Sequence, residues 1–209
     1  MNGNDFTDED ISKGFKQIEG RLTRLSILLE IARPYYVKYD FVRSHPLVWM
    51  INESMFHVIG QIARCWFDKA KGGFKTISVR ELYEQIRRNK KYQGLQSIEK
   101  QSFDALGKEI EKYGKKYEKE ISTLADKYYA HIEVRTEEEV KREYEDLKIG
   151  WKEIEDLIVS AKRVVNEMVK FWEEREANFE MGSYWIFRDQ FWNSIKDEIL
   201  VIKQPPLDK

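Results

Sequence analysis

The chain has 209 residues, of which 42% are hydrophobic and 35% are charged, a balance that excludes an intrinsically disordered protein. Lys and Arg number 36 against 37 Asp and Glu, so the chain lacks the overall positive charge of many nucleic-acid-binding proteins. Its single cysteine excludes a disulfide framework and a cysteine-based zinc site.

The composition also bears on where the protein acts. The first ten residues, MNGNDFTDED, are polar and acidic, unlike a secretory signal peptide. The sequence contains no apolar run of about 18 residues that could span a membrane. We therefore expect a cytoplasmic protein that makes no contact with a membrane.

Charge is unevenly distributed along the chain. Residues 61–92 contain nine basic and three acidic residues, whereas residues 136–180 contain eight basic and fourteen acidic ones. Such segregation is suited to steering a polyanion to one side of the molecule. It is equally consistent with two solvated faces of opposite sign.

The first predicted helix runs to about Arg33. Thr7 and the acidic residues after it form an N-terminal cap, and Pro34 is expected to end the helix because its ring clashes with the preceding turn. Apolar residues recur at steps of three and four, the spacing of one helical face: Ile11, Phe15, Ile18, Leu22, Leu25 and Leu29.

A second helix is predicted from about Pro46 to the glycine pair Gly72 and Gly73. It carries two apolar stripes and is therefore expected to be the most buried helix. We interpret His57, within this helix, as a buried core residue rather than a metal ligand. The stripes consist of Val48, Met55, Ile59, Ile62 and Trp66, and of Trp49, Phe56, Ala63 and Phe67.

The third predicted helix begins at a capping box formed by Ser78 and Glu81. The helix is short and ends in a cluster of basic residues, which is suited to attracting a polyanion. The four members of this basic cluster are Arg87, Arg88, Lys90 and Lys91.

A long fourth helix is predicted next, and its apolar stripe leads to a histidine. The stripe steps by three and four through Phe103, Leu106, Ile110, Tyr113, Tyr117, Ile121, Leu124 and Tyr128. The next step is His131, which the pattern therefore places on the inner side of the helix. Gly107 and Gly114 interrupt the pattern, each at a cost of about 1 kcal/mol relative to alanine, so tertiary packing must hold this helix.

A fifth helix is predicted over residues 137–180, opened by a second capping box at Thr136–Glu139 and ended by Gly182. A short terminal helix is predicted over about 184–200. The sequence thus indicates an all-α protein, an antiparallel helical bundle over residues 1–182 with an additional C-terminal helix and tail over 183–209.

Most catalytic signatures are absent from the sequence, including the phosphate-binding loop, the nucleophile elbow and the paired metal-binding motifs of di-iron bundles. We expect neither a metal nor a cofactor. His131 has Lys127 one turn before it, and a histidine beside a cation suits phosphodiester chemistry because it can transfer a proton while the cation stabilises phosphate charge. The alternative is that His131 ends the helix and interacts with its dipole.

Two segments resemble the abortive-infection U-type branch of the HEPN family (higher eukaryote and prokaryote nucleotide-binding). They are ADKYYAHIE, residues 125–133, and IARCWFDKAKGGFKTISVRELYEQI, residues 62–86. The resemblance implies a helical bundle that forms a homodimer, with the signatures of two protomers at a shared cleft. It also implies metal-independent RNA cleavage in toxins or phage defence, with Asp126, Lys127 and His131 in the signature positions.

The signature departs from the family pattern at one position, because Ala125 stands where the family has arginine. Three hypotheses follow. The protein is a non-catalytic module that binds RNA, a nucleotide or a partner such as an antitoxin or another defence protein. Alternatively, it is an endoribonuclease that uses His131, Lys127 and Asp126, or it is a structural helical scaffold. For an RNA-binding protein of this family we predict that the basic cluster, Arg87, Arg88, Lys90 and Lys91, binds the RNA.

Overall fold

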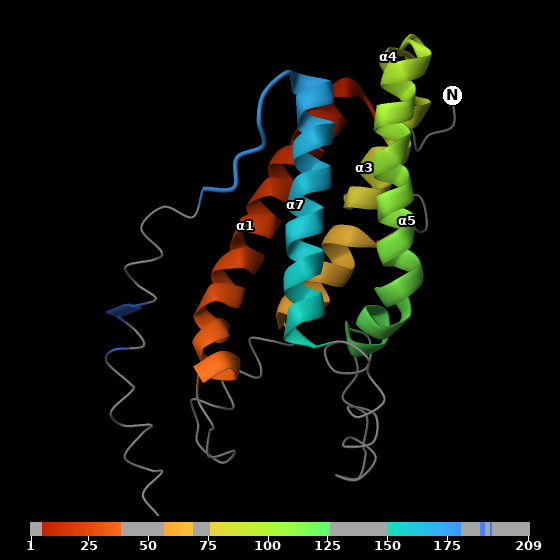
Figure 1. Ribbon diagram of the computed structural model, residues 1–209. Helices are drawn as coiled ribbons and strands as arrows, with labels where there is room; N and C mark the ends of the chain where they lie inside the picture. Colours follow the sequence, from red (N-terminus) through yellow and green to blue (C-terminus); the bar gives the residue numbers. More distant parts are fainter. Residues whose placement is uncertain are drawn as a thin grey trace, which may run out of the picture.

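The computed structural model describes residues 6–38, 57–68, 76–125 and 150–180, together with residues 189, 190 and 193. The described residues form helices and their connections, which confirms the predicted all-α bundle (Figure 1). The elements are α1 (Asp8–Lys38), a helical segment over 57–66, α3 (Val79–Arg88), α4 (Lys90–Gln93), α5 (Ser97–Ala125) and α7 (Trp151–Glu173). The predicted boundary at residues 182 and 183 and nearly all of the predicted C-terminal helix lie outside the described residues.

Helix α1 begins where the sequence predicts but ends later. Thr7 Oγ1 accepts a hydrogen bond from Asp10 N at 3.2 Å, and Asp10 Oδ2 accepts one from Thr7 N at 2.9 Å, so the two residues cap each other. The predicted end before Pro34 is wrong, because the helix continues to Lys38. A proline removes one helical hydrogen bond, but its fixed φ is itself helical, so it does not always end a helix.

The helical segment 57–66 is buried on two sides, as its sequence predicts. Val58, Ile59, Ile62, Ala63 and Trp66 are all buried. His57, in contrast, is exposed, so its interpretation as a core residue is wrong. It belongs to the polar face of this segment, which repeats at helical spacing through the exposed residues Arg64 and Asp68. The predicted first part of this helix, from Pro46, lies outside the described residues.

Ser78 caps α3 as predicted and also connects two elements. Its Oγ accepts a hydrogen bond from Glu81 N at 3.1 Å and donates one to the carbonyl of Asp68 at 2.6 Å. The start of α3 is therefore held to the end of the segment 57–68. The carboxylate of Glu81 accepts a hydrogen bond from Gln85 Nε2 at 2.7 Å.

Helix α5 buries its predicted apolar stripe and contacts α3 at its two glycines. Phe103, Leu106, Ile110, Tyr117 and Ile121 are buried. The glycines make room for two side chains of α3: a Cβ atom on Gly107 would lie 2.2 Å from Tyr83 Oη, and one on Gly114 would lie 2.5 Å from Arg80 Nη2. The two glycines disfavour the helix, but they allow α3 to pack closely against α5, and this packing offsets the cost.

Helix α7 is shorter than the predicted helix over 137–180. Gly150 has an extended backbone, and its N–H donates to Glu153 Oε2 at 2.9 Å, so α7 begins at Trp151. The helix ends at Glu173, and Glu174 adopts a left-handed conformation with φ of 56°. The predicted cap at Gly182 is therefore wrong, and the predicted capping box at Thr136 lies outside the described residues.

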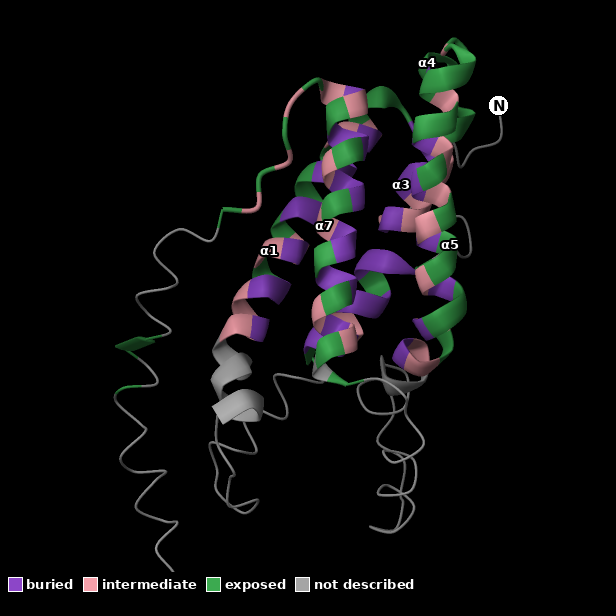
Figure 2. Ribbon diagram, in the orientation of Figure 1, coloured by how far each residue is buried: buried purple, intermediate pink, exposed green. Residues whose placement is uncertain are grey.

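The buried faces of the helices meet in one core (Figure 2). Helix α1 packs along α7, and α3 and α5 cover the other side of α7 (Figure 1). The largest fully buried side chains come from all of these elements and include Phe15, Leu22, Trp66, Leu82, Ile121 and Met168. Among the described helices, none is sufficiently long and apolar to cross a membrane.

The Gly107→Ala substitution is expected to destabilise the protein by about 1–3 kcal/mol, because the added methyl group overlaps the buried Tyr83 ring. Gly20→Ala in α1 is the matched control. A Cβ atom on Gly20 meets no atom within 4 Å, so this variant should gain about 0.5–1 kcal/mol from helix propensity. Urea unfolding of both variants measures the difference, and equal effects would show that the α3–α5 contact is not tight.

The Glu174→Gly substitution is expected to raise the free energy of unfolding by about 1 kcal/mol. Glu174 is exposed and ends α7 in the left-handed conformation that glycine adopts without a Cβ penalty. Glu174→Ala keeps the Cβ atom while removing the charge, so it should give no such gain. Thermal or urea unfolding of the pair separates backbone strain from charge.

Candidate functional site

The predicted catalytic residues Asp126, Lys127 and His131 lie outside the described residues, as does His45. The structure does describe Ala125, which is the last residue of α5. The signature therefore starts at the C-terminal end of the helix that carries the buried stripe. The position where the resemblance places an arginine is therefore Ala125, at the last residue of α5.

Two members of the basic cluster are engaged in the fold. Arg87 Nε lies 3.5 Å from Asp104 Oδ1, and its guanidinium lies 5.7 Å from the centre of the Tyr83 ring. Lys91 Nζ donates to the carbonyl of Trp172 at 2.9 Å, at the end of α7 where helix carbonyls carry partial negative charge. Both cations therefore stabilise packing between elements.

All four members of the basic cluster are exposed, but the other two make no comparable contact with a described residue. Arg88 and Lys90 are exposed, and neither forms an ion pair with another described residue. Between them, Asn89 caps α4 by accepting a hydrogen bond from Lys91 N at 2.8 Å and donates to Asp8 Oδ1 at 3.0 Å. The two solvent-facing cations thus project from a well-supported turn.

The basic cluster and the start of the signature lie at opposite ends of α5. Helix α4 leads directly into Ser97, whereas Ala125 is at the far end of the helix (Figure 1). The 29 residues of α5 span roughly 43 Å at the rise of an α-helix. Within one protomer, the structure does not bring the basic cluster to the described start of the signature.

A cleft of about 550 Å³ lies between α3 and α5. Its charges balance, because four basic and four acidic side chains line it: Arg80, Arg87, Lys108 and Lys115, and Glu84, Asp104, Glu111 and Glu118. Arg80 makes two hydrogen bonds to the carboxylate of Glu118, at 3.0 and 2.9 Å. A polyanion would therefore meet paired charges here rather than an excess of positive charge.

Two tyrosines converge on one carboxylate at the end of this cleft. Tyr92 Oη donates to Asp104 Oδ1 at 2.8 Å, and Tyr83 Oη lies 3.4 Å from the same oxygen. Burial is the main cause that raises the pKa of both phenols, so they stay protonated donors at neutral pH. The arrangement holds α3, α4 and α5 together and contains no group poised for proton transfer.

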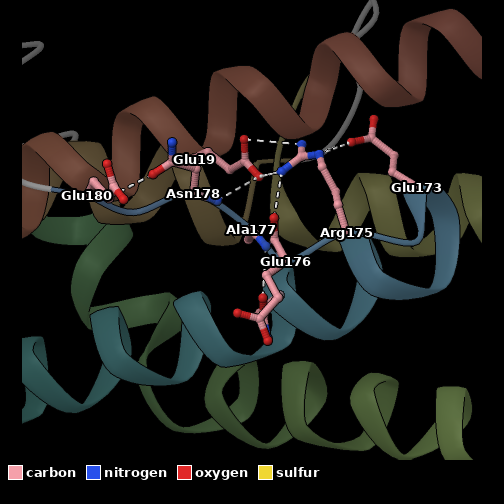
Figure 3. A network of polar contacts seen from close by, with 8 residues as sticks. Glu19, Glu173, Arg175, Glu176, Ala177, Asn178 and Glu180 are labelled. Carbon is pink, nitrogen blue, oxygen red and sulfur yellow. Dashed lines mark hydrogen bonds and ion pairs between the residues drawn. The ribbon is translucent and has the colours of Figure 1, made fainter.

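An ion-pair network at the end of α7 was not predicted from the sequence. Arg175 donates from Nη1 to Glu19 Oε1 at 2.7 Å and from Nε to Glu173 Oε2 at 2.6 Å (Figure 3). Glu19 is only 7% exposed. One feature of the sequence could have indicated this network. Glu19 lies next to Ile18, beside the buried stripe of α1, and a buried carboxylate requires a partner.

The described residues provide neither a cluster of metal ligands nor a reactive cysteine. No group of three His, Cys, Asp or Glu side chains within them is arranged to hold a metal ion. Cys65 is 1% exposed, and burial raises the pKa of its thiol to about 11. Its thiolate is therefore scarce at neutral pH, and the residue acts as part of the core.

Comparison with known proteins agrees with the resemblance in the sequence. The family model of AbiU2 HEPN domains matches residues 15–173, from within α1 to the last residue of α7. No curated protein and no solved structure matches the chain significantly. The family match covers more than half of the sequence. The chain therefore belongs to the AbiU2 family of HEPN domains, a prokaryotic family of the abortive-infection type.

Proposed function

We propose that this protein is a non-catalytic HEPN module that binds RNA in prokaryotic defence. Ala125 is the observation that carries the proposal. An arginine there would offer a planar, permanently charged group that grips a phosphate through two hydrogen bonds. Alanine offers neither charge nor donor, and no other residue of α5 can take over a position at its last turn.

Without the arginine, the rate of RNA cleavage should fall far enough that the protein binds RNA but hardly cleaves it. Removing one preorganised donor that stabilises transition-state charge typically lowers the rate by about 10²–10³. The sequence retains His131 and Lys127, which remain able to contact a phosphate. RNA is therefore held at the signature but cleaved poorly.

Arg88 and Lys90 supply further phosphate contacts in this proposal. These two members form no ion pair with a described residue, whereas Arg87 and Lys91, although exposed as well, hold elements together. Because the cluster and Ala125 are separated by the length of α5, an RNA that contacts both within one protomer follows the long axis of the bundle.

We further propose that the protein acts in the cytoplasm as a homodimer, in association with an antitoxin or another defence protein. Family membership supports these assignments. The second candidate function is a metal-independent endoribonuclease, which the retention of His131 and Lys127 favours.

Restoring the arginine tests the proposal directly. In EDTA, the wild-type protein should bind a labelled single-stranded RNA and leave it intact. Ala125→Arg should gain about 10²-fold in cleavage rate, since the missing donor is restored. Ala125→Gln is the uncharged control, and Ala125→Arg combined with His131→Ala should show no gain.

Wild-type cleavage as fast as that of Ala125→Arg would instead establish the endoribonuclease. If no variant binds or cleaves the RNA, the structural helical scaffold is the hypothesis that remains.

Sedimentation of the wild type at micromolar concentration tests the homodimer, and a single species of 25.1 kDa would contradict it.

The basic cluster yields a separate prediction. Arg88→Gln and Lys90→Gln should each lower the slope of log K against log salt concentration by about 0.7, because one phosphate contact is lost. Lys91→Gln should leave the slope unchanged and lower stability by about 1 kcal/mol, because it removes a hydrogen bond at the end of α7. Filter binding over a salt series and urea unfolding measure the two effects.

A further inference from the structure

Residues 174–180, here called the strap, follow α7 and run back beside α1 (Figure 1). Their exposure alternates with every residue. Arg175, Ala177 and Phe179 are half-buried, whereas Glu174, Glu176, Asn178 and Glu180 are exposed. This period of two is typical of an extended segment that docks one face on a surface.

The strap is anchored by its arginine. Arg175 reaches the buried Glu19 of α1 through Nη1 at 2.7 Å and Nη2 at 3.4 Å, and it reaches Glu173 through Nε at 2.6 Å (Figure 3). Two carboxylates around one guanidinium make this position selective for a cationic side chain. A bidentate arrangement further favours arginine over lysine.

Side chains of the bundle also hold the backbone of the strap. Ala177 N donates to Asn166 Oδ1 at 2.9 Å, and Asn178 N lies 3.3 Å from Glu19 Oε1. Hydrogen bonds from the bundle to main-chain groups provide affinity for an extended peptide independently of most of its side chains. Asn166 lies on α7 and Glu19 on α1, so the strap is held from both helices.

The third anchor is aromatic. Phe179 packs against the core, and Lys162 Nζ lies 5.4 Å from the centre of its ring. An ammonium group over the face of a ring is attractive, and more so where water is partly excluded. The α1–α7 surface thus recognises an arginine, a small residue two positions later and an aromatic residue two positions beyond that.

We propose that Glu19, Lys162, Asn166 and Glu173 form a peptide-binding groove, occupied in cis by the strap and able to bind a partner peptide of the same chemistry in trans. The partner is an extended peptide with the pattern Arg-x-small-x-aromatic. The groove does not depend on RNA binding. The strap begins one residue after the end of the family match, so it lies outside the matched region.

Tethering keeps the groove closed in the wild-type protein. A segment joined directly to the end of α7 has an effective concentration on the order of mM. A free peptide with the same contacts therefore has to reach a similar concentration before it displaces the strap. A strap that has lost its arginine anchor competes far less.

Fluorescence anisotropy with a labelled peptide tests the groove. The peptide is EREANFE, the sequence of the strap, with blocked ends, and the protein is full-length Arg175→Ala. Binding should saturate, and a control peptide with Gln in place of its Arg should bind at least about tenfold more weakly, as expected for a lost charged hydrogen-bonded pair. Wild-type protein should show no saturable binding below about 1 mM, and adding Glu19→Gln to Arg175→Ala should reduce the preference for the arginine peptide, because Glu173 is then its one remaining carboxylate partner.

A second variant covers the case in which Arg175→Ala fails to fold because Glu19 is left buried without its partner. Ala177→Pro retains the Arg175 side chain as a partner for Glu19, but it removes the N–H that donates to Asn166 and so weakens the strap, which a peptide in trans then displaces from Glu19 more easily than in the wild type. It should bind EREANFE with the same preference for arginine, though more weakly. Equal binding of both peptides, or no binding to either variant when circular dichroism shows a folded bundle, would overturn the groove.

Discussion

The packing of α1 along α7 is the constraint on which the rest of the structure depends. The stripe of α1 places Ile11, Phe15, Ile18 and Leu22 against the core, and Met168 is among the fully buried residues of α7. Burial of apolar side chains drives this contact, since each contributes about 1.5–3 kcal/mol. The same surface includes Glu19, whose buried carboxylate requires a cation, and Arg175 supplies it from beyond the end of α7. The route of the chain after Glu173 is therefore a consequence of one charged residue in an apolar stripe.

The contact between α3 and α5 has a different physical basis. Two glycines of α5 leave space for side chains of α3, and two ion pairs, Arg80 with Glu118 and Arg87 with Asp104, link the helices. Some basic residues that suggest a nucleic-acid-binding surface in the sequence thus stabilise contacts between helices in the fold. Arg87 pairs with Asp104, and Lys91 holds the end of α7. Counting basic residues overestimates the positive surface that the folded protein presents.

The proposed function depends on a contrast between the helical bundle, which matches the family, and the signature segment, which departs from it at Ala125. The chain matches the AbiU2 family model over residues 15–173, and the described helix α5 ends at Ala125, where the signature begins. At the end of that helix, Ala125 replaces the group best suited to stabilise charge on a phosphate. Binding needs fewer preorganised groups than cleavage, because only interactions that strengthen in the transition state accelerate a reaction. A binding module is thus the function most consistent with an intact scaffold and an altered signature.

By itself, the sequence determined the features that depend on neighbours a few residues apart. The caps at Thr7 and Ser78, the buried stripes of α1 and α5 and the all-α class were predicted because capping and helical periodicity are local. The family resemblance likewise required only two short segments and is confirmed. Only the tertiary structure decided that α1 passes Pro34, that α7 ends at Glu173 and that half of the basic cluster is engaged in packing. These outcomes depend on contacts between distant parts of the chain, of which the pair Glu19 and Arg175, 156 residues apart, is the clearest.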